Sequence, residues 1–292
     1  MFLSSGKLLR YMSNLIILYD YHEAPPFLTG NPHIKSGYRG YLPTKLCFRS
    51  LFTLHNESIN VWSHLLVGLY FFYQYFMDFS LITNEEHATI YDQLAFISMV
   101  IAIQIAMFAS AAYHLFNCQS QDAHSKFLLI DCIGIAIGLS GCFFPVMHYA
   151  FYCFPELKIF YGVTLGAVFG AAGYFVTRPW FGDKNSTYFR IVTYSLVSLS
   201  GIIPSAHWVI LYGVKSEIVA LFLPRIALLY FFGGTGAFFY VTRLPEVLLP
   251  GKFDIFGHSH QIWHVFAAIV FIVGHKTQQD LFLYVTSHIC PT

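Results

Sequence analysis

Seven long apolar stretches, separated by short polar segments, constrain this chain more than any other feature. They cover residues 61–82, 93–116, 127–150, 159–177, 188–212, 220–242 and 260–286. A helix that crosses a bilayer needs about 20 apolar residues. Only 11% of the residues are charged, whereas a soluble domain carries about 25%. We therefore predict an all-α membrane protein with a bundle of seven transmembrane helices.

The positive charges predict how this bundle is oriented. With Arg225 left out, 12 lysines and arginines fall in the N-terminal arm and in the segments after spans two, four and six, and three fall on the other side. Cytosolic segments are the ones enriched in lysine and arginine. We therefore expect a cytosolic basic arm over 1–60, the seven-helix domain over 61–286 and a short lumenal tail over 287–292. The net charge of +1 gives no argument for binding nucleic acid.

Unusual polar residues gather at the cytosolic ends of distant spans. Ser110 and His114 lie near the end of span two, Asp131 lies near the start of span three, and His260 and His264 open span seven. Two residues four apart on a helix project from one face. Three imidazoles with an open fourth position are typical of a zinc site. We predict that His114, His260 and His264 bind Zn²⁺ and that the spans bring them to one depth.

The chemistry of such a site leaves two alternatives. Zinc lowers the pKa of a bound water toward 7. Asp131 is then a candidate general base, and Ser110 is a candidate group for orienting the water or stabilising an oxyanion. The other reading is a structural zinc that holds three helices together without turnover.

The segment before span one has two readings as well. It contains Glu57, Asn60 and His64. These residues fit a polar turn that caps the helix beside an interfacial tryptophan, and they also fit groups placed around the zinc site.

Glycine and proline give two further expectations. Gly162, Gly166 and Gly170 recur every fourth residue, so we expect dense packing of a neighbouring helix against span four, with a dedicated dimer face as the alternative. Pro224 is expected in the first turn of the sixth span, where its missing N–H is tolerated. Arg225 would then extend to the membrane interface, and the alternative is a buried functional arginine.

The cysteines and the remaining polar motifs constrain the fold and the function less than the features above. The six cysteines follow no disulfide-scaffold spacing, although Cys153 and Cys290 share the non-cytosolic side and have the option of a bridge.

Residues 7–19 fit a short helix on the membrane surface or a solvated arm, and no cleaved signal peptide is expected. The sequons at Asn56 and Asn185 fall on the predicted cytosolic side, so neither should carry a glycan. His148 and His207 are interpreted as interfacial groups.

Four short motifs together resemble the progestin and adipoQ receptor family, which includes the adiponectin receptors and the haemolysin-III-like proteins. They are NESINVWSH (56–64), SAAYH (110–114), the segment LLIDCIGIAIG (128–138) and GHSHQIWH (257–264). The resemblance implies seven helices, a cytosolic N-terminus and zinc held by three histidines, which correspond to His114, His260 and His264. The acidic residue that reaches the metal through water corresponds to Asp131, and the motif serine to Ser110.

Further segments are most similar to one subgroup of that family. They are YHLFNC (113–118), AFYC (150–153) and IIPSAHWV (202–209). The resemblance implies a Golgi membrane protein that holds Raf kinase through its cytosolic N-terminal region and damps MAP-kinase signalling. The alternatives are a zinc-dependent lipid amide hydrolase of ceramidase type and a receptor for a lipid or hormone. A transporter is disfavoured because the polar groups do not line a path across the membrane.

Overall fold

The computed structural model describes residues 16–182, 186–288 and 290, and it is almost entirely helical. A two-stranded antiparallel ribbon, β1 (Leu18–Tyr19) and β2 (Tyr38–Arg39), precedes the helices. The helices are α2 (Thr44–Ser50), α3 (Ser58–Thr83), α4 (Ile90–Phe116), α5 (Gln121–Ala150), α6 (Pro155–Val176), the 3₁₀ turn η1 (Pro179–Gly182), α7 (Thr187–Leu199), α8 (Ile202–Tyr212), α9 (Glu217–Thr242) and α10 (Ser259–Ser287).

Each predicted span coincides with a helix, or with a pair of helices, within a few residues. Among the described residues, six helical stretches are long and apolar enough to cross a membrane: α3, α4, α5, α6, α7 together with α8, and α9. Helix α10 is 29 residues long, but the segment from His275 to Asp280 carries several polar and charged residues. Composition alone therefore does not assign α10 as a span.

The fifth predicted span bends where a single helix was expected. Helix α7 ends at Leu199 and α8 begins at Ile202. Pro204 has no N–H to donate to the carbonyl of Ser200, which removes a bond that would continue the helix. Gly201 lies in the bend, where an added Cβ would overlap the ring of Phe143. The proline and this close contact explain the break.

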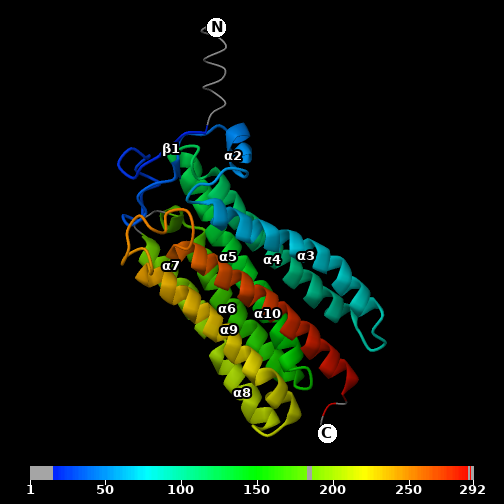
Figure 1. Cartoon of the computed structure of the whole chain (residues 1–292). Coiled ribbons are helices and arrows are strands. Elements are labelled where there is room, and N and C mark those ends of the chain that lie inside the picture. Colours follow the sequence, from blue (N-terminus) through cyan, green and yellow to red (C-terminus); the bar gives the residue numbers. More distant parts are fainter. Residues whose placement is uncertain (1–15, 183–185, 289, 291–292) are drawn as a thin grey trace, which may run out of the picture.

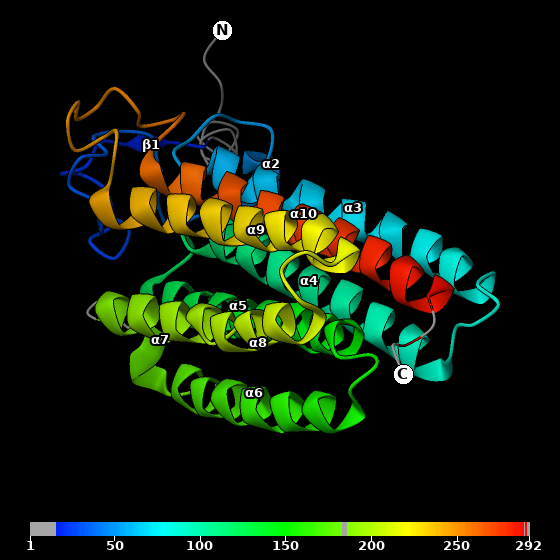
Figure 2. The ribbon, with the colours of Figure 1, turned by 90° about the horizontal axis from the view of Figure 1, so that it is seen from below.

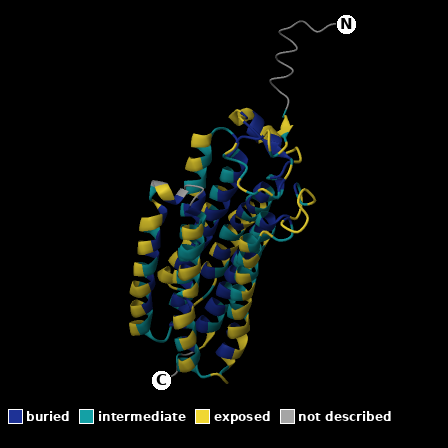
Figure 3. Ribbon diagram, turned by 90° about the vertical axis from the view of Figure 1, so that its left-hand side faces the viewer, coloured by how far each residue is buried: buried dark blue, intermediate teal, exposed yellow. Residues whose placement is uncertain are grey.

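The helices run side by side as one bundle, with β1 and α2 at one end and the C-terminus at the other (Figure 1). Seen from below, α10 lies between α9 and α3, with α4 and α5 on the next level and α6 at the edge (Figure 2). Exposed residues, yellow in Figure 3, follow the sides of the helices that face away from the bundle. Large apolar side chains occupy those faces, among them Leu69, Phe72 and Phe76 of α3. An apolar exterior on long helices is the arrangement that lipid requires.

The tightest helix contact joins α4 and α5. Gly134, Gly138 and Gly141 of α5 face Ala109, Ala106 and Ala102 of α4, so closely that an added Cβ at any of the three would overlap the opposing alanine.

The prediction of dense packing at Gly162, Gly166 and Gly170 was wrong. A Cβ at Gly162 or Gly170 would meet nothing within 4 Å, and one at Gly166 would meet only the Phe144 ring at 3.9 Å. Spacing shows that a helix can be approached closely, but not which helix approaches it.

The expectation for Pro224 was also wrong. Helix α9 begins at Glu217, after the extended residue Ser216, so Pro224 lies inside the helix. A proline within a membrane helix is tolerated where neighbouring groups compensate for the lost hydrogen bond. Arg225 does not simply extend to an interface, because its guanidinium forms an ion pair with Asp280 of α10. This ion pair connects α9 to α10.

Residues 16–57 fold over one end of the bundle, and we call them the cap. Strand β1 occupies the described end of the segment predicted as a surface helix, and its residues before Ile16 lie outside the described chain. The loop 243–258 packs against the cap. The Asp254 carboxylate accepts hydrogen bonds from the Lys35 N–H at 2.9 Å and the Ser36 hydroxyl at 2.7 Å, and the buried Glu246 accepts from Asn31 at 3.0 Å. Residues 16–57 of the basic arm are therefore a folded element.

A disulfide lies at the end opposite the cap. Cys153, between α5 and α6, is bonded to Cys290, just beyond α10. The bridge that the sequence offered as an option is therefore present. The other four cysteines are free thiols.

Candidate metal centre

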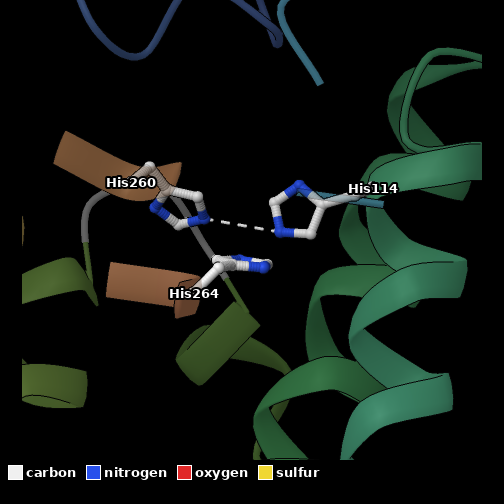
Figure 4. A group of neighbouring side chains, drawn as sticks. All are labelled: His114, His260 and His264. Carbon is white, nitrogen blue, oxygen red and sulfur yellow. Dashed lines mark hydrogen bonds between the residues drawn. The ribbon is translucent and has the colours of Figure 1, made fainter. Parts of the chain in front are cut away.

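Three histidine rings converge beneath the cap. His114 comes from the last turn of α4, and His260 and His264 come from the first two turns of α10 (Figure 4). His114 and His264 are both 2% exposed. Each of the three residues offers a ring nitrogen, and these atoms lie within 4.8 Å of one another. The i, i+4 spacing places the two rings of α10 on one helix face, as the sequence predicted.

The separation of these nitrogens fits a tetrahedral metal. The Nε2 atoms of His114 and His260 are 3.4 Å apart. Two ligands at 2.0–2.1 Å from a tetrahedral zinc are themselves about 3.3 Å apart. Three neutral imidazoles suit Zn²⁺ among the common biological metals. This group could therefore hold one zinc ion, with a fourth position left for another ligand.

Glu57 sets the proton position on His114. Its Oε2 accepts a hydrogen bond from His114 Nδ1 at 2.7 Å and from the Asn60 amide at 2.6 Å, and its Oε1 accepts from Asn117 at 3.3 Å. Burial by itself would raise the pKa of Glu57, but its interactions with His114 and Asn60 outweigh this effect and hold the pKa well below its ordinary value. A carboxylate only accepts hydrogen bonds, so Nδ1 carries a proton and Nε2 is the ring nitrogen left to face a metal.

His64 supports the ring of His264. The two imidazoles are stacked with their centroids 3.9 Å apart, and His64 Nε2 lies 3.3 Å from the backbone oxygen of His264. The Ser63 hydroxyl is 3.5 Å from His264 Nδ1. Glu57, which directly precedes α3, and Asn60 and His64, in the first two turns of α3, therefore all lie around the histidine group.

Ser110 and Asp131 lie beside this group on facing helices. Both are buried. The Ser110 hydroxyl interacts with the Asp131 carboxyl, which is also close enough to His114 for electrostatic interaction. The contact of Gly134 with Ala109 brings the two helices together at this level. Five residues from three helices are thus assembled in one place.

Residues that the motifs did not single out complete the surroundings. Asn117 contacts Glu57, and the Gln261 amide donates to the backbone oxygens of Ile255 and Asn56 at 2.8 and 3.3 Å. His258 Nε2 lies 3.1 Å from that same Asn56 oxygen, so this histidine joins the loop to the cap. Asn117 lies one turn beyond His114 and Gln261 directly follows His260, and that proximity was the available signal.

The histidines interpreted as interfacial form internal contacts. His148 pairs with Asp92 at 3.2 Å, and His207 Nδ1 lies 2.8 Å from the Tyr161 hydroxyl, within hydrogen-bond distance. A further pair, absent from the predictions, joins His275 of α10 to Asp78 of α3 at 2.7 Å, with both side chains buried. Asp78, inside the first predicted span, was the available signal for its pair, whereas Asp92 lies just before the predicted start of the second span.

Comparison with known proteins assigns the chain to a family. The model for the family described as haemolysin-III related matches residues 52–274. The chain belongs to the haemolysin-III-related family. The matched range contains all three histidines of the group, together with Ser110, Asp131 and Glu57. This family consists of membrane proteins, in agreement with the apolar helices.

Named relatives place the chain near the progestin and adipoQ receptors. It is 35% identical to "Progestin and adipoQ receptor family member 3" of Mus musculus over 278 residues, which covers 94% of this chain and 89% of the relative. The Homo sapiens protein of that name is 34% identical over the same shares. "Heptahelical transmembrane protein 1" of Arabidopsis thaliana is 32% identical, with 93% of this chain and 83% of the relative covered. The resemblance drawn from the four motifs is confirmed.

Proposed function

We propose that this haemolysin-III-related protein crosses the membrane seven times, with α10 as the last span and the cap in the cytosol. The excess of lysine and arginine on the cap side supports this orientation. The Cys153–Cys290 disulfide at the opposite end and the free thiols Cys47 and Cys118 at the cap end fit an oxidising lumen and a reducing cytosol. The name of the Arabidopsis relative says that that protein has seven helices.

The function we propose is that of a Golgi anchor which holds a Raf-type kinase at the cytosolic face and thereby damps MAP-kinase signalling. Similarity to the third progestin and adipoQ receptor member along 94% of the chain supports this role. The observation that best supports this role is that the cap is folded and that one face of α2 points outward. Lys45, Phe48 and Arg49 are exposed on that face, a mixture of positive charge and aromatic surface suited to protein recognition.

The test changes this face without unfolding the cap. Deleting residues 1–60 would also remove Glu57, so the double variant Lys45→Glu/Phe48→Ser is the sharper choice. We expect recruitment of the kinase to Golgi membranes, measured by co-sedimentation, to fall at least about tenfold, the loss that one central interface residue commonly causes. Lys126→Glu, on an exposed lysine of α5, is the matched control. Unchanged recruitment by the double variant would refute docking through α2.

A second function is supported by Asp131 and Ser110 beside the histidines: hydrolysis of a lipid amide of the ceramide type. Bound zinc would polarise the carbonyl and activate water. Asp131 would accept a proton from the attacking water and return it to the leaving amine as the C–N bond breaks. Ser110 would donate a hydrogen bond to the developing oxyanion. Lipid chains could reach this depth from the bilayer.

Asp131→Asn separates the two roles because it keeps the shape of the side chain and removes the base. The hydrolase account predicts that turnover of ceramide falls about 10²–10⁴-fold while zinc content is retained. The anchor account predicts kinase recruitment equal to that of the wild type in the same variant. Absence of turnover in a zinc-loaded wild type would leave the metal a structural role.

A further inference from the structure

Two free thiols meet where the cap joins the bundle. Cys47 lies in α2 and Cys118 lies two residues beyond α4. Their Sγ atoms are 3.8 Å apart, and the two residues are 0% and 1% exposed. A disulfide places the sulfurs about 2.05 Å apart, so side-chain rotation with a small shift of the cap would close the distance. The contact joins segments that are 71 residues apart in the chain.

A buried positive charge lies beside this pair. The Arg39 guanidinium donates hydrogen bonds to the Ser50 hydroxyl at 2.7 Å and to the Leu115 backbone oxygen at 3.1 Å. Within the described residues it makes no ion pair with a carboxylate. The hydrogen bond with Cys47, followed by the charge of Arg39, lowers the pKa of the Cys118 thiol. Positive charge beside a thiol favours the thiolate, which is the reactive form.

A small cavity borders Cys118. It has a volume of about 10 Å³ and is lined by Cys118, Arg39, Glu57, Asn117 and three further cap residues, which is room for about one water. Hydrogen peroxide is only slightly larger than water. The other two free thiols, Cys132 and Cys142, lie within α5 and have no sulfur neighbour in the described chain. Sulfur contact, a nearby positive charge and an adjoining cavity thus coincide at one pair.

We propose that Cys47 and Cys118 form a reversible disulfide, a modification site at which a peroxide fastens the cap to the end of α4. The Cys118 thiolate attacks one peroxide oxygen, the O–O bond breaks, and water leaves after taking up a proton. The resulting sulfenic acid is attacked by Cys47, whose thiol proton leaves with the hydroxyl as a second water. One peroxide is reduced to two waters and two thiols are oxidised. A dithiol reductant reverses the reaction by exchange.

Neither thiol is a ligand of the proposed metal or an exposed residue of the proposed docking face, although Cys47 lies in the helix that carries that face. Cys118 lies four residues beyond His114 and Cys47 is in the cap, so the bond would hold α2 against the helix that carries His114. The Cys153–Cys290 disulfide is at the other end of the bundle and does not take part.

Thiol counting on the full-length protein in detergent tests the proposal. After brief treatment with hydrogen peroxide, the protein is denatured and labelled with a polymer-tagged maleimide. We expect the four free thiols to fall to two, with mass spectrometry recovering a cross-linked peptide pair that contains Cys47 and Cys118. Thioredoxin with its reductase should restore four. Persistence of all four thiols, or a different cross-linked pair, would overturn the proposal.

Single variants test which thiol reacts first. In Cys47→Ser the sulfenic acid on Cys118 should persist and be captured by dimedone, whereas in Cys118→Ser the Cys47 thiol should stay unmodified. Cys47→Ala serves as a second variant should the serine disturb the cap. Cys132→Ser is the matched control and should still form the bond. Dimedone on Cys47 in the Cys118→Ser protein would contradict the assigned order.

Discussion

At the scale of single residues, Glu57 shows how a side chain outside the histidine group governs its chemistry. The hydrogen bond of 2.7 Å from His114 Nδ1 fixes the ring's tautomer and orientation. Glu57→Gln keeps the shape and removes the charge. We predict that zinc affinity falls about 10–100-fold, as is common when such a partner is changed, while the helix content stays the same. The zinc affinity is measured by competition with a fluorescent chelator.

The control for this prediction is Glu86→Gln, which changes an exposed carboxylate in the α3–α4 connection. Its zinc affinity should match that of the wild type. Equal affinities in all three proteins would mean that Glu57 serves only to connect the cap to α4.

At the scale of elements, the contact of α4 with α5 holds Ser110 beside Asp131. Gly141→Ala places a methyl group against Ala102. Overpacking of this kind destabilises a protein by about 1–3 kcal/mol. We therefore predict that the free energy of unfolding in detergent falls by that amount. Adding Ala102→Gly should restore most of it. Gly170→Ala, where nothing lies within 4 Å, should not destabilise the protein, and an equal loss there would contradict this account of the packing.

Much of the architecture could be predicted at the element scale because lipid imposes a simple rule: long apolar runs become helices. The positions of α3 to α6 followed from that rule. Helix contacts did not, because the glycines of α6 and the pair Gly134 and Gly138 of α5 share the same fourfold spacing, yet only those of α5 have a helix packed closely against them. The cap lacks a periodic apolar pattern, so its fold was not predictable.

At the site, motifs identified more than periodicity did. Glu57, Asn60, His64, Ser110, Asp131 and the three histidines were all named from short segments, and the structure brings them together. The pairs Asp78–His275 and Asp92–His148 were missed because each joins residues from different helices, and only the three-dimensional packing makes them neighbours.

At the scale of the whole molecule, the proposed orientation predicts which loops face the cytosol. A cysteine introduced by Gln121→Cys at the cap end should react with a membrane-impermeant maleimide on sealed Golgi vesicles. Glu86→Cys, at the opposite end, should react only after detergent opens the vesicles. Both positions are exposed, so accessibility within the protein is matched. The reverse pattern would place the cap in the lumen.

The account's central claim is that His114, His260 and His264 together hold one metal ion. Its most direct test is the zinc content of detergent-purified protein, measured by mass spectrometry of the element. The wild type should contain about one zinc per chain, His260→Ala/His264→Ala should contain almost none, and the exposed-residue control His87→Ala should match the wild type. A folded wild type without zinc, or a double variant that retains it, would contradict the claim.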